Sequence, residues 1–145
     1  MNKLQKNVFV INGPNINLLG KREPSIYGKT SLAEIEDAMQ QLADRYNMQI
    51  SFYQSNHEGE IIDYLQSLNA GSYIIINPAG LTHTSVSIRD CIAAIECTTI
   101  EVHISNIAAR EEFRSKSLIS AVCKGTISGL GASGYNFALN WIKDN

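Results

Sequence analysis

The sequence has few cysteines and no long apolar run, and both features restrict the cellular compartment expected for the protein. It contains three cysteines, Cys91, Cys97 and Cys123, with no C-x-x-C spacing. An odd, dispersed set argues against a disulfide framework, so we expect reduced, mostly buried thiols in a cytoplasmic protein. No apolar stretch approaches the length of a membrane span, and residues 1–7 lack the apolar segment of a signal peptide.

The sequence also lacks a large excess of one charge and the common cofactor-binding motifs. Lys and Arg number 12 against 14 Asp and Glu, a net charge of -2 without a basic run, which argues against nucleic acid or an anionic membrane as a partner. No G-x-G-x-x-G follows the first apolar run, and no G-x-x-x-x-G-K-[ST] occurs. His57, His83 and His103 lie in separate segments without a metal-ligand spacing. We therefore expect no metal and no cofactor.

What is present is a regular alternation of apolar runs and amphipathic segments. Short apolar runs predict strands at residues 8–11, 48–53, 73–76, 98–104 and 122–128. Helical spacing of apolar residues predicts helices at about residues 32–46, 61–68, 85–95 and 134–142. Continuously apolar strands that alternate with helices are typical of a parallel sheet covered on both faces. The prediction is α/β: one domain over residues 1–145, a flavodoxin-like three-layer sandwich with a five-stranded parallel sheet.

Three local features refine this picture. Ser31 and Glu34 form a capping-box pattern at the start of the first helix. Lys124 falls inside the last predicted strand, where a side chain extending from the sheet edge accounts for it. The glycine-rich segment 129–134 follows that strand, and tight packing of the closing helix explains it better than phosphate binding does.

Polar and titratable side chains gather after the predicted strands. In open parallel sheets, ligands bind beyond the carboxyl ends of the strands. The residues at or after the ends of the first, third and fourth strands include Asn15, Arg22, Tyr27, Asn77, His83, Glu101, His103, Ser105, Arg110 and Arg114. This clustering predicts a site for a polar small molecule at one edge of the sheet.

The connection from residue 13 to residue 30 is longer than the ~2–6 residues usual between a strand and a helix. It carries Gly20 and Gly28 as hinge candidates, and its Gly-Pro and Glu-Pro steps favour ordered turns over a disordered excursion. We interpret it as a lid that excludes water from bound substrate.

Four sequence blocks resemble the type II 3-dehydroquinate dehydratase (type II dehydroquinase) family, and the resemblance extends from Val8 to Leu139. The blocks are NGPNINLLGKREPSIYG (12–28), QSNHEGEIID (54–63), NPAGLTHTS (77–85) and EVHISNIAAREEFR (101–114), the last followed by GTISGLGASGY (125–135). Their order and separation make the resemblance specific. It implies anti elimination of water from 3-dehydroquinate to 3-dehydroshikimate through an enolate, without metal or cofactor.

The resemblance also implies catalytic roles. Tyr27 matches the general base, and Arg22 matches the lid arginine beside it. Free tyrosine ionises near pH ~10, so phenolate chemistry at neutral pH needs a nearby cation. Asn15 matches the asparagine that holds a water against the enolate, and His103 matches the general acid. Glu101 would orient the imidazole of His103.

Substrate contacts and assembly are implied in the same way. Asn77 and the backbone N–H groups of Ile104 and Ser105 would hold the substrate carboxylate, while His83 and Arg114 would contact ring hydroxyls; Arg110 would have a supporting role. Asp90 matches a residue that reaches a neighbouring subunit's site, and the family forms homododecamers built as tetramers of trimers. One block departs from the family pattern: Leu81 replaces the usual tyrosine, and Ala79-Gly80 reverses the commoner order. That departure puts substrate affinity and the subunit contact in question.

Plainer readings remain open for individual residues. Tyr27 could anchor its loop, Asp90 could be a helix-surface charge, and Glu101 could pair with Arg110 or Arg114. Other function classes are a flavodoxin-like or receiver-like binding module and an inactive scaffold. The segment Asn12-Gly13-Pro14-Asn15 offers neither the hydroxyl-rich loop of flavodoxins nor the clustered acids of receivers. The same reaction serves aromatic amino acid biosynthesis in the shikimate pathway and quinate breakdown, and both stay open.

Overall fold

The computed structural model of the chain describes residues 4–145 and is built on one parallel sheet. Its strands are β1 (Asn7–Asn12), β2 (Gln49–Gln54), β3 (Tyr73–Asn77), β4 (Thr98–His103) and β5 (Gly125–Ser128). They lie in the order β2-β1-β3-β4-β5, and every neighbouring pair is parallel. This is the flavodoxin-like strand order, so the predicted α/β architecture is confirmed.

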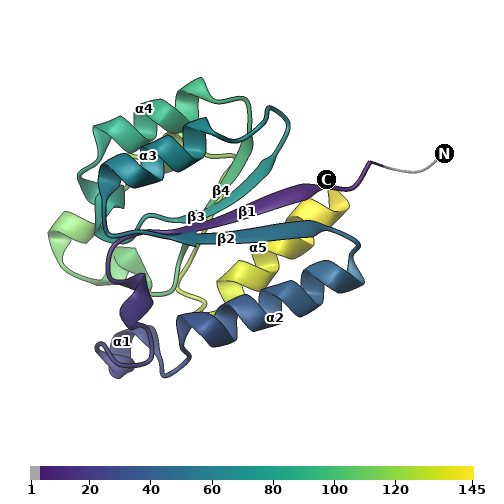
Figure 1. Cartoon of the computed structure of the whole chain (residues 1–145). Helices are drawn as coiled ribbons and strands as arrows, with labels where there is room; N and C mark the ends of the chain where they lie inside the picture. Colours follow the sequence, from purple (N-terminus) through teal and green to yellow (C-terminus); the bar gives the residue numbers. More distant parts are fainter. Residues whose placement is uncertain (1–3) are drawn as a thin grey trace.

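The longer helices form the two outer layers, and one short helix lies outside them. The helices are the short α1 (Pro24–Tyr27), α2 (Leu32–Arg45), α3 (Glu58–Gln66), α4 (Val86–Ala94) and α5 (Ser133–Asp144). Figure 1 shows α2 and α5 on one face of the sheet and α3 and α4 on the other. The segment with α1 lies beyond the edge at which the strands end.

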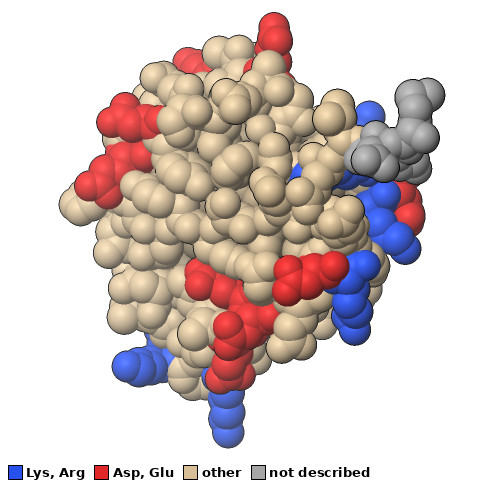
Figure 2. All heavy atoms as spheres, turned by 45° about the vertical axis from the view of Figure 1, so that its right-hand side comes forward, with Lys and Arg blue, Asp and Glu red and all other residues tan. Residues whose placement is uncertain are grey.

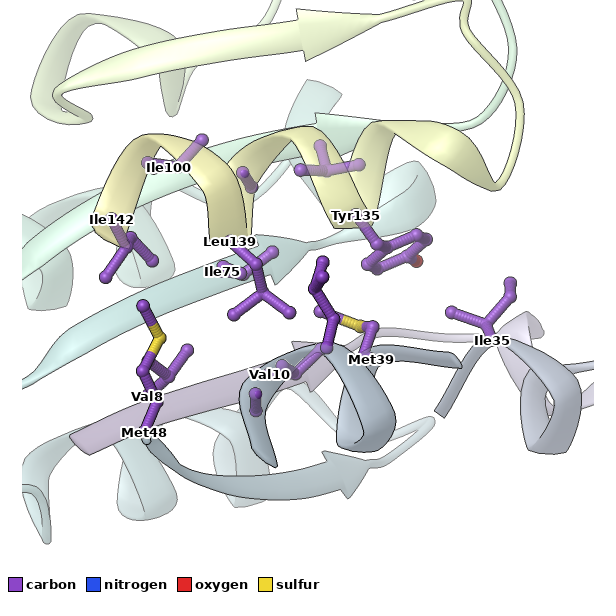
Figure 3. Packing of buried hydrophobic residues seen from close by; sticks show 14 of the residues in the cluster. Val8, Val10, Ile35, Met39, Met48, Ile75, Ile100, Tyr135, Leu139 and Ile142 are labelled. Carbon is purple, nitrogen blue, oxygen red and sulfur yellow. The ribbon is translucent and has the colours of Figure 1, made fainter. Parts of the chain in front are cut away.

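The core is divided by the sheet because successive strand residues point to opposite faces. Val8, Val10 and Ile75 pack with residues of α2 and α5, as Figure 3 shows. Ile74 and Ile76 pack on the other face, in the cluster that includes residues of α3 and α4. Burial on both faces explains why these strands are continuously apolar in the sequence.

Two local predictions for the helices are confirmed. The Ser31 hydroxyl accepts a hydrogen bond from the Glu34 backbone N–H at 3.1 Å, so Ser31 is the N-cap of α2, as the pattern predicted. A Cβ on Gly134 would lie 3.3 Å from side-chain atoms of both Val102 and Ile127. The small residue therefore allows α5 to approach β4 and β5 closely.

The predicted strand at residues 122–128 was wrong in its first half. Ser120–Val122 form a 3-10 helix, and β5 begins at Gly125, so Lys124 precedes the strand instead of lying within it. Val122 and Cys123 are apolar because they pack against the core cluster beneath α3 and α4. Apolar character alone does not distinguish this side-chain burial from membership of a strand.

The visible surface carries charges of both signs. On the face shown in Figure 2, Lys and Arg lie among Asp and Glu around a broad uncharged area. None of the helices formed by residues 4–145 has the length and apolar character that a membrane span requires.

Candidate active site

A pocket opens at the carboxyl edge of the sheet, where β1, β3 and β4 end. Its walls come from the segment after β1, the turn after β3 and the segment after β4, which brings together residues distant in sequence. The lining residues are Pro14, Asn15, Ile16, Arg22, Tyr27, Asn77, Ala79, Gly80, His83, His103, Ile104, Ser105, Ile107, Arg110 and Arg114. Of the predicted site residues, Glu101 and Asp90 do not line it.

The backbones that follow β1 and β3 approach each other closely beside this pocket. The Gly13 N–H donates to the Asn77 carbonyl at 2.8 Å, which joins the ends of β1 and β3. A Cβ on Gly13 would lie 2.5 Å from the Pro78 carbonyl oxygen. Only glycine allows this approach without displacement of the backbone.

The Tyr27 phenol lies between two arginines. Its oxygen accepts a hydrogen bond from the Arg110 guanidinium at 2.8 Å. The guanidinium carbons of Arg22 and Arg110 lie 4.8 Å and 5.1 Å from the centre of the Tyr27 ring. Both guanidinium groups therefore lie within cation–π range of the Tyr27 ring, and Arg110 also donates to its oxygen.

The segment that carries Tyr27 is ordered in turns, as predicted. It contains a 3-10 helix at Ile16–Leu18 and the short α1, which ends at Tyr27. Gly20 and Gly28 have φ angles of 88° and 81°, in the left-handed region that glycine adopts readily. Closure of this segment as a lid stays a prediction.

Asn15 is held in an unusual backbone conformation at the pocket wall. Its φ angle is 70°, in the left-handed region, which asparagine tolerates better than most residues. The Asn15 N–H donates to the Asn56 side-chain oxygen at 3.0 Å, and Gln54 donates to the same oxygen at 3.2 Å. The end of β2 therefore fixes the position of Asn15.

His103 and Glu101 form a buried acid–base pair on β4. The Nε2 atom of His103 is hydrogen-bonded to Glu101, and the carboxylate has no exposed surface. Nδ1 is thus the ring nitrogen of His103 that remains for a bond to substrate. Glu101 pairs with His103 and not with Arg110 or Arg114, because Arg110 is bonded to Tyr27 and Arg114 to Glu111.

Hydrogen bonds keep Glu101 ionised despite its burial. Burial raises the pKa of this carboxyl group, but the hydrogen bond and charge of His103, and then hydrogen bonds from Ser120 and Ser117, hold the pKa below 4.5. The ionised Glu101 carboxylate is hydrogen-bonded to Nε2 of His103 and so fixes the orientation of the imidazole.

The predicted substrate-binding side chains have partners within the pocket wall. Asn77 donates to the Tyr135 hydroxyl at 2.9 Å, and its side-chain oxygen accepts the Ala79 N–H at 3.1 Å. The His83 Nδ1 atom is 2.8 Å from the Lys116 carbonyl oxygen. If Nδ1 is protonated, Nε2 of His83 is left as an acceptor for a ligand hydroxyl.

Asp90 lies outside this pocket, and its role at another subunit's site stays a prediction. It is an exposed residue of α4 whose carboxylate is 3.3 Å from the Arg89 guanidinium. Within one chain it has the contacts of a surface charge.

The three cysteines lie outside the pocket lining and have no disulfide partner. Burial raises the pKa of the Cys91 thiol, and burial together with the charge of Glu101 raises the pKa of the Cys123 thiol to about 12. Both shifts oppose the thiolate that a cysteine nucleophile needs. Within residues 4–145, no three His, Cys, Asp or Glu side chains are grouped to bind a metal ion.

Comparison with known proteins explains why these residues converge. The family model described as "Dehydroquinase class II" matches residues 6–143. This chain belongs to the class II dehydroquinase family. A 3-dehydroquinate dehydratase from Endomicrobium trichonymphae is 58% identical over 92% of this chain and 94% of its own. One from Campylobacter jejuni subsp. jejuni is 55% identical over 93% of this chain and 86% of its own.

A solved structure agrees with the sequence match. The crystal structure of the type II dehydroquinase from Butyrivibrio crossotus DSM 2876 superposes with a TM-score of 0.92 and 40% sequence identity, over 99% of this chain and 100% of the other. The family resemblance carried by the four sequence blocks is thereby confirmed.

The turn after β3 shows what the departure from the family pattern does. Ala79 has a φ angle of 55°, in the left-handed region, whereas Gly80 is not among the residues with positive φ. The reversed order thus puts alanine where glycine is favoured. Leu81 is half-buried and packs against the core cluster beneath α3 and α4, so its side chain makes an apolar contact there.

Sequence patterns understated two features of this class II dehydroquinase site. Arg110 was expected only to support the site, yet it bonds directly to the Tyr27 oxygen. The hydrogen bonds from hydroxyl groups to Glu101 were not predicted. Serine and threonine are common in loops, so no pattern distinguishes a residue that bonds a buried carboxylate from one that faces water.

Proposed function

We propose that the pocket catalyses anti elimination of water from 3-dehydroquinate to give 3-dehydroshikimate. The relatives are named 3-dehydroquinate dehydratases. The assignment is supported by relatives at 58% and 55% identity over more than nine-tenths of the chain. The observation that carries it is one pocket that contains both a phenol flanked by two guanidinium groups and an imidazole paired with a buried carboxylate. A base and an acid are the two groups that an elimination needs.

The reaction begins when the Tyr27 phenolate takes a proton from the carbon beside the ketone. The electrons of that C–H bond form an enolate, and Asn15 stabilises its oxygen. The enolate then re-forms the ketone as the C–O bond to the hydroxyl breaks. His103 donates a proton to the departing oxygen from Nδ1, since Nε2 is bonded to Glu101. One water leaves, and the product is a conjugated enone.

Substrate binding uses the remaining wall of the pocket. Asn77, together with the backbone N–H groups of Ile104 and Ser105, holds the carboxylate, and His83 and Arg114 contact ring hydroxyls. All of these residues line the pocket. Arg22 and Arg110 stabilise the charge that develops around Tyr27.

The Tyr27→Phe variant tests the base directly. We expect turnover to fall by about 10²–10⁴-fold while substrate still binds, because the lost group acts in the transition state. The assay follows the ultraviolet absorbance of the enone. Tyr53→Phe is the control, since Tyr53 is stacked on Tyr64 and does not line the pocket. Retention of more than about a tenth of the activity in Tyr27→Phe would refute the assigned base.

The proposed chemistry uses neither a metal nor an imine. We therefore expect full activity after treatment with a chelator and after borohydride in the presence of substrate. Loss of activity to borohydride, with a mass increase on a lysine, would indicate Schiff-base chemistry instead.

Assembly is the second part of the proposal. We expect a homododecamer, a tetramer of trimers, in which Asp90 of one subunit reaches the pocket of a neighbour. Asp90 is exposed and does not line the pocket of its own chain, which agrees with a role across an interface. Its carboxylate would accept hydrogen bonds from a substrate hydroxyl or a pocket arginine.

Light scattering and the Asp90→Ala variant test this assembly. We expect a mass near that of twelve chains, and a loss of activity or assembly in Asp90→Ala that exceeds the loss in Asp63→Ala. Asp63 is the matched control because it is an exposed aspartate on α3. A fully active monomer would refute the shared site.

The reaction fits two cellular roles. We place the enzyme in the cytoplasm and in the shikimate pathway, with quinate breakdown as the alternative. Deletion of the gene distinguishes them: a requirement for aromatic amino acids indicates biosynthesis, and failure to grow on quinate alone indicates breakdown.

A further inference from the structure

The buried carboxylate of Glu101 is surrounded by hydroxyl groups that come from outside its own strand. Thr82 donates to Oε2 at 3.0 Å, Ser117 lies 3.0 Å from both carboxylate oxygens, and Ser120 donates to Oε1 at 2.9 Å. Thr82 and Ser117 also lie within 3.1 Å of each other. We call Thr82, Ser117 and Ser120 the hydroxyl cluster.

The hydroxyl cluster connects two segments that flank the pocket. Thr82 belongs to the 3-10 helix after β3, whereas Ser117 and Ser120 belong to the segment between Arg114 and β5. The backbones of the two segments are joined, since the Leu118 N–H donates to the Thr82 carbonyl at 2.8 Å. The hydroxyl cluster thus lies behind the pocket lining and links the two segments that flank it.

Geometry gives these hydroxyls a specific effect on His103. A carboxylate with no exposed surface has to satisfy its lone pairs within the protein. With Oε1 and Oε2 bonded to hydroxyls, the carboxylate is fixed in orientation, and its Oε2 then fixes Nε2 of His103. Removal of a hydroxyl would free the carboxylate to rotate or to take up a proton, and either event would disturb the imidazole.

We propose that Thr82, Ser117 and Ser120 are positioning residues for the dehydration, which act through Glu101 to keep His103 oriented as the general acid. This inference rests on the proposed function, because it assigns a role within that reaction. None of the three hydroxyls lines the pocket, so they do not touch the substrate.

The proposal predicts a change in the pH profile. Hydrogen bonds from His103, Ser120 and Ser117 offset the effect of burial and hold the pKa of Glu101 low. Loss of a donor therefore raises that pKa, so Glu101 becomes protonated at a higher pH. The acid limb of kcat/KM, which reports the free enzyme, should move upward. The other titratable groups that act on Glu101 are His103 on β4 and Cys123 before β5, and Cys123 is neutral in this range because its pKa is about 12.

The experiment compares Ser120→Ala and Thr82→Val with wild type. Ser120 is half-buried and caps no backbone group, so its loss should leave the fold intact; Thr82→Val conserves the shape of a fully buried side chain. Ser115→Ala is the control, because Ser115 bonds only the Glu112 carbonyl in the same segment. Ser120→Thr, which keeps a hydroxyl, should restore the wild-type profile.

We expect the acid limb of both variants to move up by about one pH unit, which is about a tenfold loss of kcat/KM on the acid side. Ser115→Ala should leave it unchanged. Lower activity at every pH with an unmoved limb would overturn the proposal, as would an unaltered profile. An inactive wild type would instead refute the dehydratase assignment, so the two failures are distinguishable.

Discussion

The turn Ala79-Gly80 gives a stability prediction that can be worked out from two backbone angles. Ala79 occupies the left-handed region with φ at 55°. An L-residue with a Cβ costs about 1–2 kcal/mol there relative to the right-handed form. Glycine avoids this cost but loses about 0.5–1 kcal/mol more conformational entropy on folding. Ala79→Gly should therefore raise the free energy of unfolding by about 0.5–1 kcal/mol.

Replacing Gly80 with alanine should add to this gain in the free energy of unfolding. Gly80 does not have a positive φ, and a Cβ placed on it would meet no atom within 4 Å. Gly80→Ala at a compatible site stabilises by about 0.4–1 kcal/mol, because the unfolded chain loses freedom. The double variant should thus gain about 1–2 kcal/mol, which for a chain of this size is about 3–6 °C in Tm.

Thermal denaturation followed by circular dichroism measures this effect. Ala38→Gly is the matched control, since Ala38 is exposed in the middle of α2, where glycine should cost about 1 kcal/mol. The opposite signs of the two alanine-to-glycine changes separate backbone conformation from a general effect of glycine. A fall in Tm in Ala79→Gly would show that the strain at this angle is smaller than the entropy and methyl packing that glycine loses, and would refute the prediction.

Three further predictions concern the ends of elements and the buried carboxylate. Gly13→Ala should destabilise the protein by about 1–3 kcal/mol and reduce turnover, because its Cβ would lie 2.5 Å from the Pro78 carbonyl oxygen. Urea unfolding measures the loss. Gly59→Ala is the control and should show no such loss, since a Cβ on Gly59 would meet nothing within 4 Å. Ser31→Ala should cost about 1 kcal/mol by removing the N-cap of α2, and an unchanged urea midpoint would contradict this. The pKa of Glu101 in the folded protein lies below the usual value of 4.5. The contribution of Glu101 to stability is therefore complete above pH 4.5 and is lost as the pH falls through the lowered pKa. Glu101→Gln should show a weaker loss of stability in acid than wild type.

The sequence by itself determined the architecture and the edge of the sheet that carries the site. Val8, Val10 and Ile75 are apolar because both faces of their strands are covered, and this pattern is visible without coordinates. Asn15, Asn77 and His103 follow or end such strands, so parallel strand order places them at one edge. The family blocks then supplied the roles, and the family match confirms the resemblance.

Only the tertiary structure decided the contacts among segments that are distant in the chain. The bond between Arg110 and the Tyr27 oxygen joins residues 83 positions apart, and no periodicity predicts such a pairing. Val122 and Cys123 were assigned to a strand because their apolar character can be read from the local sequence, whereas their packing against the core cannot. The hydroxyls around Glu101 were unpredictable for the same reason. A serine has no sequence signal for its partner, because its hydrogen bond depends on where folding brings a buried charge.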